Sequence, residues 1–515
     1  MDRKAFISAL ISGILLGVAY NLLWGWLAFV ALVPLFWGIR FQSLRTAYLL
    51  GLITTGVSYC VSLSWVDTAL HIYGGMASIW SILAVVLLGI FLAIWSAIAL
   101  PSGLWLHRRT QVPLYLIWPA LWTVLDWGRT VWFPFGGFPW SHLGMPLAFY
   151  PWVIQIADLF GIFGVIFLVA LINAVFAESI FLLQGSQTLS KVKKMWALSG
   201  AITVLMGIVL VYGAVRTKQW DQPTPMQPRL RVALIQGNIE QDVKMQTENR
   251  GEQLRVYQEA ASKVQEGVDL VVWPESAWPY AMSLNLKRMD PKEFGWKPTK
   301  NSYPYSLIGT QFSLGEDYYN GAALFDAQGN VQGTYQKTKL VPFGEYVPFQ
   351  SLFSFLSPVA FREGFVAGNG LKPIPMEWVP VGTLICYEDI FPQLSRRLVN
   401  EDAQVLVNLT NDAWYGVSSA PLQHLALSVF RAVETRRFLL RSTNTGITAV
   451  VDATGRVLAR APLFERSTLM FRVPLLSAKT LYVLWGDVWV WVCMLFLLSV
   501  IGVSFRRKPE SRHMI

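Results

Sequence analysis

The sequence contains few cysteines, few histidines and few charged residues. Only 3 of its 515 residues are cysteine and 5 are histidine, and Asp, Glu, Lys and Arg together make up 14% of the chain. A soluble globular domain carries about 25% charged residues. The shortage of charge therefore excludes an ordinary soluble protein of this length, and the shortage of cysteine excludes a small scaffold held together by disulfides.

Hydrophobic residues make up 54% of the chain and are unevenly distributed. They are concentrated in residues 5–216 and 482–504, whereas residues 217–481 have an ordinary globular composition. A membrane-crossing helix needs about 20 mostly apolar residues. We predict eight spans, near residues 5–21, 23–39, 47–66, 78–100, 113–128, 158–183, 194–215 and 483–504. The expected domains are a seven-helix transmembrane domain (1–216), a polar domain (217–481), and an eighth helix with a basic tail (482–515).

The net charge of +10 comes largely from short loops between the apolar runs. Arg129 is the main exception, because the other loops on its side carry almost no basic residue. The basic loops hold Arg3, Lys4, Arg40, Arg45, His107, Arg108, Arg109, Lys191, Lys193, Lys194, Arg506, Arg507 and Lys508. By the positive-inside rule, both termini are expected in the cytoplasm and the polar domain outside it. This pattern favours a lipid bilayer over nucleic acid as the partner.

The polar domain alternates strand-like and helix-like segments. Three prolines near residues 217–228 mark a linker before it. Strands are expected near 230–239, 269–276, 306–312 and 404–412, hairpins at 322–337 and 445–460, and helices near 249–265, 392–398 and 420–437. This alternation predicts an α/β sandwich.

Cys386 is the single cysteine of the polar domain and follows a strand-like apolar run in VGTLICYEDIFP. The other two, Cys60 and Cys493, lie in predicted membrane spans. An unpaired thiol on an extracytoplasmic domain invites a chemical explanation, although free cysteine is also often a buried core residue. The domain has only one histidine, His424, so one histidine and one cysteine argue against a zinc site.

Three strand ends or loops of this domain finish in reactive groups. They are Glu275 in VVWPES, Lys337 in YQKTKLVPFGEYVP, and Cys386 in LICYED. A thiol attacks an acyl carbon as thiolate, so it needs a base, and a partly buried carboxylate can serve. An ammonium group can stabilise the negative oxygen of the tetrahedral intermediate. These three groups together are sufficient for acyl transfer.

The motifs WPES, YxKxxLVPFGE and CYE before a helix resemble the carbon–nitrogen hydrolase (nitrilase) superfamily, which has a Glu-Lys-Cys triad and an αββα four-layer sandwich. LVPFGEYVP, NLTNDAWYG (408–416) and LLRSTNTGITAV (439–450) match more narrowly. With the eight spans, they resemble the apolipoprotein N-acyltransferase family of bacterial cytoplasmic membranes. The resemblance covers essentially the whole chain.

The resemblance implies a function. Members of that family move an acyl chain from a phospholipid, usually phosphatidylethanolamine, through a cysteine thioester to the N-terminal amine of a diacylglyceryl-cysteine lipoprotein. No cofactor is implied. On this sequence it implies Cys386 as nucleophile, Glu275 as general base and Lys337 as oxyanion stabiliser. It further implies Glu345, Tyr387 and Glu388 as supporting active-site residues, and Asn320, Trp414 and Arg437 in substrate access or binding. We also expect residues 352–361 and 365–367 to form a membrane-facing lid.

Two other functions fit parts of the sequence. One is a membrane-anchored amidase or nitrilase that hydrolyses a small amide, which would share the triad without needing so many spans. The other is a transporter that carries an inactive binding domain. The intact triad and the scarcity of charge within the spans argue against the transporter.

Overall fold

The computed structural model describes residues 2–22, 24–132, 137–184, 188–221, 227–295, 304–347 and 364–506. The chain divides into two compact units. Unit 1 comprises residues 1–64, 82–215 and 487–515, and unit 2 comprises residues 65–81 and 216–486. Residues 65–81 thus pack with unit 2, although the sequence pattern assigns them to the transmembrane domain.

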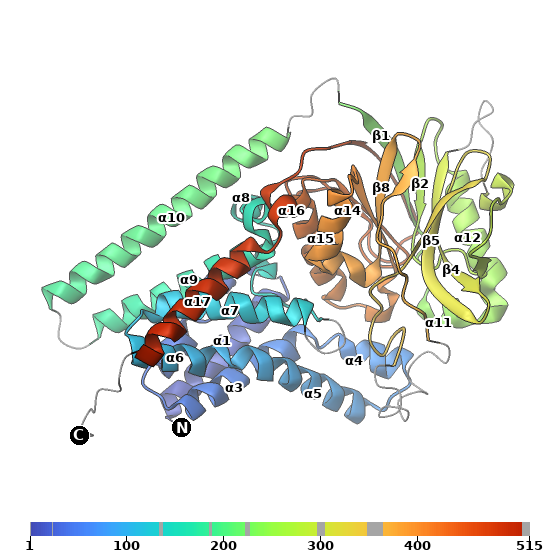
Figure 1. Ribbon diagram of the computed structural model, residues 1–515. Coiled ribbons are helices and arrows are strands. Elements are labelled where there is room, and N and C mark those ends of the chain that lie inside the picture. Colours follow the sequence, from blue (N-terminus) through green and yellow to red (C-terminus); the bar gives the residue numbers. More distant parts are fainter. Residues whose placement is uncertain are drawn as a thin grey trace. The chain divides into compact units, whose positions relative to one another are not determined.

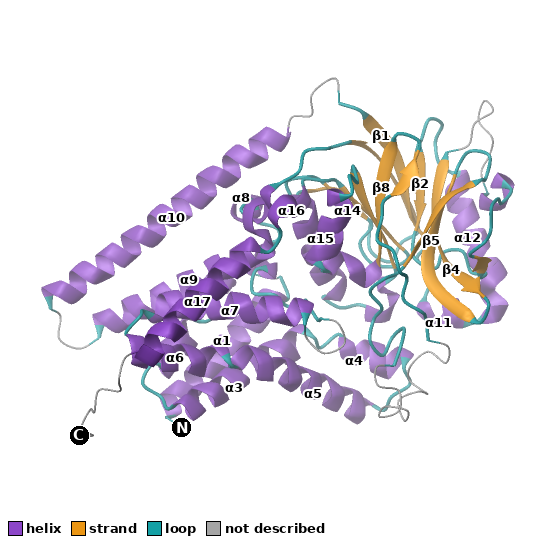
Figure 2. Cartoon of the chain, in the orientation of Figure 1, coloured by secondary structure: helices purple, strands orange, loops and turns teal. Residues whose placement is uncertain are grey.

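Unit 1 is built from helices (Figures 1 and 2). They are α1 (Arg3–Tyr20), α2 (Val33–Ile39), α3 (Leu44–Ser62), α5 (Ser78–Ala97), α6 (Ala99–Thr110), α7 (Leu114–Val131), α8 (Pro151–Ile154), α9 (Ala157–Leu183), α10 (Leu189–Asp221) and α17 (Val488–Arg506). Within the described residues, six helical stretches are long and apolar enough to cross a membrane: 3–20, 44–62, 78–110, 157–183, 189–221 and 488–506. α10 also runs into the predicted linker.

The second and fifth predicted spans do not meet this standard. The second is broken into a 3₁₀ turn, η1 (Gly25–Phe29), and the short helix α2, which has Pro34 in its first turn. Asn173 of α9 compensates for the break, because its Nδ2 donates to Ala28 O (2.7 Å) and its Oδ1 accepts from Leu32 N (2.8 Å). Broken helices are tolerated at membrane depth where protein groups satisfy the freed backbone. The fifth span, α7, contains the buried charges of Asp126 and Arg129.

Unit 2 contains two mixed β-sheets. The first has the order β13-β1-β2-β4-β5-β6, with β3 also paired to β4. Its strands are β1 (Arg229–Gln236), β2 (Leu270–Trp273), β3 (Met282–Ser283), β4 (Tyr305–Leu314), β5 (Asp317–Phe325), β6 (Val331–Gln336) and β13 (Ser467–Pro474). The second has the order β12-β11-β10-β9-β8-β7. Its strands are β7 (Ile374–Met376), β8 (Val379–Ile385), β9 (Val405–Thr410), β10 (Leu439–Thr443), β11 (Ala449–Val451) and β12 (Val457–Arg460).

The two sheets face each other, with helices on their outer sides (Figures 1 and 2). Helix α12 (Arg250–Ser262) covers the first sheet, and α14 (Pro392–Asn400) and α15 (Ala420–Thr435) cover the second. Between the sheets, Ser442 of β10 donates to the main-chain oxygens of Ile235 (2.8 Å) and Val272 (3.1 Å). The four layers confirm the predicted αββα sandwich, and the predicted strands, hairpins and helices each coincide with an observed element.

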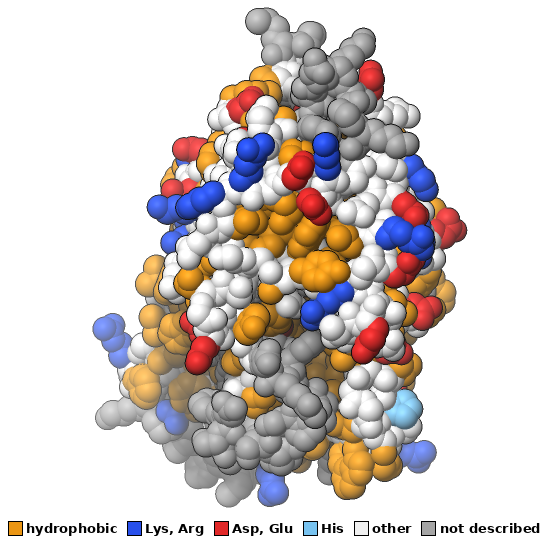
Figure 3. All heavy atoms as spheres, turned by 90° about the vertical axis from the view of Figure 1, so that its right-hand side faces the viewer, with side chains coloured by type: hydrophobic (Ala, Val, Ile, Leu, Met, Phe, Trp, Pro, Cys, Tyr) orange, Lys and Arg blue, Asp and Glu red, His pale blue; other side chains and the backbone are white. Residues whose placement is uncertain are grey.

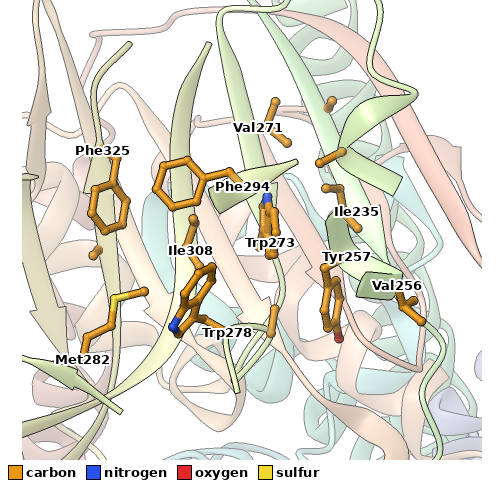
Figure 4. Packing of buried hydrophobic residues seen from close by; sticks show 14 of the residues in the cluster. Ile235, Val256, Tyr257, Val271, Trp273, Trp278, Met282, Phe294, Ile308 and Phe325 are labelled. Atoms are coloured by element: carbon orange, nitrogen blue, oxygen red, sulfur yellow. The ribbon is translucent and has the colours of Figure 1, made fainter. Parts of the chain in front are cut away.

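Helix α12 is held to the first sheet by a buried hydrophobic cluster (Figure 4). The ring of Tyr257 stacks on that of Trp273 with centroids 5.6 Å apart, and Phe294 packs against Phe325 at 5.0 Å. Each such side chain contributes about 1.5–3 kcal/mol when fully buried. On the face in Figure 3, which is the right-hand side of Figure 1, Lys, Arg, Asp and Glu side chains surround a central group of hydrophobic ones.

Candidate active site

Glu275, Lys337 and Cys386 all lie at strand ends in unit 2. Glu275 is two residues past β2, Lys337 directly follows β6, and Cys386 directly follows β8. β2 and β8 each pair in parallel with neighbouring strands. Ligands and catalytic groups gather at the carboxyl ends of such strands. The topology therefore accounts for the positions of Glu275 and Cys386, whereas Lys337 follows β6, which is antiparallel to β5, and joins the site through its contacts with Glu275 and Glu345.

Lys337 lies between two carboxylates. Its Nζ is 2.9 Å from Glu345 Oε1 and 3.6 Å from Glu275 Oε1, and its side chain is only 1% exposed. Burial lowers the pKa of Lys337, but the charges of Glu345 and Glu275 outweigh burial and raise the pKa above its usual value. Lys337 is therefore a fixed cation at the centre of the site.

Asn320 of β5 joins the two carboxylates. Its Nδ2 donates to Glu275 Oε1 and to Glu345 Oε1, both at 2.7 Å. Its main-chain oxygen accepts from the main-chain N–H of Lys337 (2.8 Å). Ionised carboxylates only accept hydrogen bonds, so these contacts fix which way the amide points. Two residues expected in different roles, Asn320 and Glu345, thus meet in a single cluster with Glu275 and Lys337.

The environment of Cys386 keeps its thiol neutral at rest. Burial raises the pKa of Cys386 well above its usual value; Glu275 raises it further and Lys337 opposes both. Burial also raises the pKa of Glu275, while Lys337 lowers it. A more basic Glu275 is a better acceptor for the thiol proton, and the charge of Lys337 acts on Cys386 in the direction that stabilises negative sulfur.

The backbone at Cys386 is strained. Its φ angle is 50°, in the left-handed region that residues with a Cβ rarely adopt. Such a conformation costs about 1–3 kcal/mol and persists only where neighbours enforce it. One constraint is Asn408 of β9, whose Nδ2 donates to Cys386 O (3.1 Å). The strained turn presents the sulfur at the end of β8.

Glu388 is the second constraint on this turn. Its Oε2 accepts from Ile385 N (2.9 Å), and its Oε1 accepts from the main-chain N–H groups of Thr338 (2.7 Å) and Lys339 (3.1 Å) and from the Tyr335 hydroxyl (2.7 Å). Glu388 is fully buried. Its carboxylate therefore joins the Cys386 turn to the segment that carries Lys337, and its supporting role in the active site stays a prediction.

Tyr387 and Trp414 each pack against another aromatic ring. Tyr387 is buried, and its ring packs edge-on against Phe391 at 5.0 Å. Trp414 is half-buried, and its ring packs edge-on against Tyr73 at 5.8 Å. Tyr73 belongs to residues 65–81, so the loop that carries Trp414 is the place where that segment joins unit 2. A role of the Tyr387 N–H in an oxyanion hole stays a prediction.

The hydrogen bonds of Arg437 are made to main-chain oxygens. It is fully buried, and its guanidinium donates to the main-chain oxygens of Ala403 (2.6 Å), Thr435 (3.2 Å), Arg436 (3.1 Å) and Ala478 (2.7 Å). None of these contacts is with a member of the cluster around Lys337. The contacts favour a structural role, joining β10 to the segment after β13, over contact with a substrate.

A second buried polar network lies beside the nucleophile and has no counterpart among the predicted residues. His424 of α15 is between Asp389 (Nε2–Oδ1, 2.9 Å) and Asp412 (Nδ1–Oδ1, 2.8 Å), and Arg441 of β10 also pairs with Asp389. All four side chains are buried. The signals for this network in the sequence are Asp389, which follows the CYE motif, and Asp412, which lies in NDAWYG. Over the described ranges, no three His, Cys, Asp or Glu side chains are arranged to hold a metal ion.

The structure describes only one of the two segments of the predicted lid, residues 365–367. Residues 352–361 lie outside the described residues. Of the second lid segment, Phe365 N donates to Glu345 O (2.9 Å) and Val366 N donates to Tyr318 O (2.8 Å). This segment is thus anchored directly beside the Glu345 side of the site.

Comparison with known proteins identifies both parts of the chain. Residues 231–481 match the family model described as carbon-nitrogen hydrolase, and residues 12–175 match the apolipoprotein N-acyltransferase N-terminal domain. A protein of Geobacter metallireducens named apolipoprotein N-acyltransferase is 33% identical, covering 99% of this chain and 96% of its own. Proteins of the same name from Methylococcus capsulatus (32% identity; 99% and 98% coverage) and Haemophilus influenzae (31% identity; 98% and 96%) are also similar.

These relatives match the whole chain, membrane helices included, and an amidase function is correspondingly less supported. Together with the six long apolar helices, they identify a membrane protein. The chain belongs to the apolipoprotein N-acyltransferase family.

Proposed function

We propose that this enzyme transfers an acyl chain from a phospholipid, through a thioester on Cys386, to the N-terminal amine of a diacylglyceryl-cysteine on an apolipoprotein. Phosphatidylethanolamine is the proposed donor. The observation that carries the proposal is the buried cluster in which Lys337 contacts both Glu345 (2.9 Å) and Glu275 (3.6 Å). Like Glu275 and Lys337, Cys386 lies at the end of a strand. The roles that the proposed reaction gives to individual residues are also proposals.

In the first half-reaction, Glu275 takes the proton of the Cys386 thiol while sulfur attacks the ester carbonyl of the phospholipid. Lys337 stabilises the negative oxygen of the tetrahedral intermediate. The C–S bond forms, the ester C–O bond breaks, and the lysophospholipid leaves with the proton that Glu275 held. The products are the acyl-enzyme and a lysophospholipid.

In the second half-reaction, the neutral N-terminal amine attacks the thioester carbon. Glu275 takes a proton from the amine, the amide C–N bond forms, the C–S bond breaks, and the proton returns to the thiolate. The thioester conserves the activation of the ester, so this step needs no ATP. Burial of the site favours amine attack over hydrolysis, because it excludes bulk water.

We further propose that the chain lies in the bacterial inner membrane with both termini cytoplasmic and the catalytic domain in the periplasm. Contacts inside unit 1 support this sidedness. Arg40 and Lys194, from two different basic loops, both pair with Glu178, and Arg108 from a third donates to Gln42 O (2.6 Å). The basic loops therefore gather at one end of unit 1, as the positive-inside rule requires.

Arg129, the exception to the basic-loop pattern, does not contradict this sidedness. It is fully buried in unit 1, where it pairs with Asp126 (2.9 Å) and donates to the main-chain oxygens of Phe138 (2.8 Å) and Trp140 (2.5 Å). A paired and buried arginine is not a free loop charge, so it does not count toward orientation.

The proposal is tested by incubating the purified full-length protein with phosphatidylethanolamine and measuring the mass of the peptide that contains Cys386. We expect an acyl mass increment on this peptide that moves to a diacylated lipopeptide with a free N-terminal amine. Cys386→Ala should abolish the increment and Glu275→Gln should slow its formation at least about 100-fold. Glu401→Gln, at an exposed position, is the matched control.

Two outcomes contradict the proposal. The absence of an adduct on wild-type Cys386 removes the thioester. Release of the acyl group only as free fatty acid, with lipopeptide present, indicates a hydrolase.

A further inference from the structure

Lys244 is a second lysine in direct contact with the Glu275 segment. It lies on α11 (Gln241–Met245), and its Nζ donates to the main-chain oxygen of Glu275 (3.2 Å). Its side chain is half-buried. Lys244 is 31 residues from Glu275 in sequence, and no motif connects the two positions.

The charges around Glu275 make this contact informative. The Glu275 carboxylate faces Lys337 and Glu345, accepts from Asn320 Nδ2, and interacts with Lys244. The charge of Glu275 in turn acts on Lys244 and raises its pKa, against the effect of burial. The acids nearest Lys244 in sequence, Glu240 and Asp242, are exposed. Two carboxylates and two ammonium groups thus share the site.

The charge balance depends on Lys244. With Lys337 alone, two adjacent carboxylates would share one cation, and one of them would tend to take up a proton. A base that is already protonated cannot accept the thiol proton. A second cation beside Glu275 removes this excess of negative charge.

We propose that Lys244 is a positioning residue for acyl transfer: its ammonium group fixes the main chain of Glu275 and keeps the Glu275 carboxylate ionised, ready to act as the base. This inference rests on the proposed roles of Glu275 and Cys386, and it assigns the second cation that those roles need.

The titration of Lys244 gives the proposal a specific signature. Burial lowers the pKa of Lys244 to about 8, with Glu275 acting in the opposite direction. Lys244 is therefore charged in the acidic range, where Glu275 is at risk of protonation, and becomes neutral above about pH 8. Removing its charge should matter at low pH and cease to matter at high pH.

The experiment measures the initial rate of thioester formation on Cys386 from phosphatidylethanolamine between pH 5 and 9, using the full-length protein in detergent micelles. We expect Lys244→Met to shift the acidic limb of the rate profile to higher pH by at least about half a pH unit. At the acidic end, the variant should therefore be about threefold slower than the wild type. Its rate should converge on that of the wild type above about pH 8. Lys244→Arg keeps the charge and should retain the wild-type acidic limb.

Lys263→Met, which removes an exposed lysine at the end of α12, is the matched control and should leave the profile unchanged. A rate ratio of wild type to Lys244→Met that is the same at every pH indicates a purely structural lysine and overturns the inference. So does failure of Lys244→Arg to restore the acidic limb while its melting temperature equals that of the wild type. Absence of an adduct on wild-type Cys386 would instead refute the proposed function.

Discussion

Asn320 and Glu275, which lie 45 residues apart, are joined by a 2.7 Å hydrogen bond from Nδ2 to Oε1. The same Nδ2 donates to Glu345 Oε1. Asn320 is therefore part of the charge arrangement of the site, in addition to any contact it makes with a substrate. It supplies the neutral donor that lets two carboxylates lie close together.

Asn320→Asp should slow thioester formation. The change replaces a donor with a third acidic group, so the pKa of Glu275 should rise further and the base should be protonated at neutral pH. We expect a loss of about 10–100-fold at pH 7 that partly recovers at pH 9, measured as the rate of acyl adduct formation on Cys386. Asn285→Asp, at an exposed position, should have the wild-type profile; an equal loss at both pH values would contradict the electrostatic explanation.

Glu388→Gln should weaken both the fold and the nucleophile. The carboxylate accepts hydrogen bonds from the main-chain N–H groups of Ile385, Thr338 and Lys339. A glutamine presents an NH₂ group to some of these donors and leaves them unsatisfied in a buried place. We expect about 2–4 kcal/mol of lost stability and at least about tenfold slower acylation. Thermal unfolding and adduct formation are the measurements, with Glu401→Gln as control; wild-type values for both would exclude the role of Glu388.

The His424 network should make stability depend on pH. Burial lowers the pKa of His424, but Asp412 and Asp389 outweigh burial and raise the pKa to about 9. Because the folded-state pKa is above the unfolded value of about 6.5, the contribution of charged His424 to the stability of the fold is complete below about pH 6.5. It is lost as pH rises to about 9, and linkage limits it to about 3 kcal/mol. The melting temperature should therefore fall between pH 6.5 and 9.

In His424→Gln, this pH-dependent part of the fall should disappear, and the protein should be less stable at pH 6.5. His71→Gln, at an exposed histidine, should keep the wild-type dependence. If the wild type and His424→Gln lose stability in parallel over this range, His424 is not charged in the folded protein.

Arg437→Lys distinguishes a structural from a substrate-binding arginine. Lysine cannot reproduce the fork of donors that contacts Ala403, Thr435 and Ala478. We expect about 2–3 kcal/mol of lost stability, with the KM for phospholipid and for lipopeptide unchanged at temperatures where the variant is folded. Arg460→Lys, at an exposed arginine of β12, is the control. A raised KM with normal stability would support the substrate role instead.

The positions of Glu275, Lys337 and Cys386 could be predicted because each ends a strand-like run and stands in a recognisable motif. The local pattern locates these strand ends, whereas the approach of Lys337 to Glu275 depends on pairing within the first sheet, where β6 is antiparallel to β5. Lys244, His424 and Arg441 could not be predicted, since their partners are set by how α11 and α15 pack and no local spacing reflects that. The break in the second predicted span could not be predicted either, because the hydrogen bonds that compensate for it come from Asn173 of another helix.

The packing of residues 65–81 with unit 2 could not be read from the sequence for a related reason. Most of them lie between the predicted spans 47–66 and 78–100, and Trp65 packs on Tyr415 (4.5 Å) and Tyr73 packs on Trp414 (5.8 Å). Aromatic contacts of this kind depend on tertiary packing. Apolar composition alone does not separate a membrane segment from one that packs on a globular domain.

The most direct test of the central claim is a single-turnover chase. The acyl-enzyme is formed with a phospholipid that carries a labelled sn-1 chain, freed of unreacted lipid, and mixed with a diacylated lipopeptide that has a free N-terminal amine. We predict that the label leaves Cys386 and appears as an amide on the lipopeptide, one chain for each thioester lost. Label that stays on Cys386, or that appears as free fatty acid, would contradict this account.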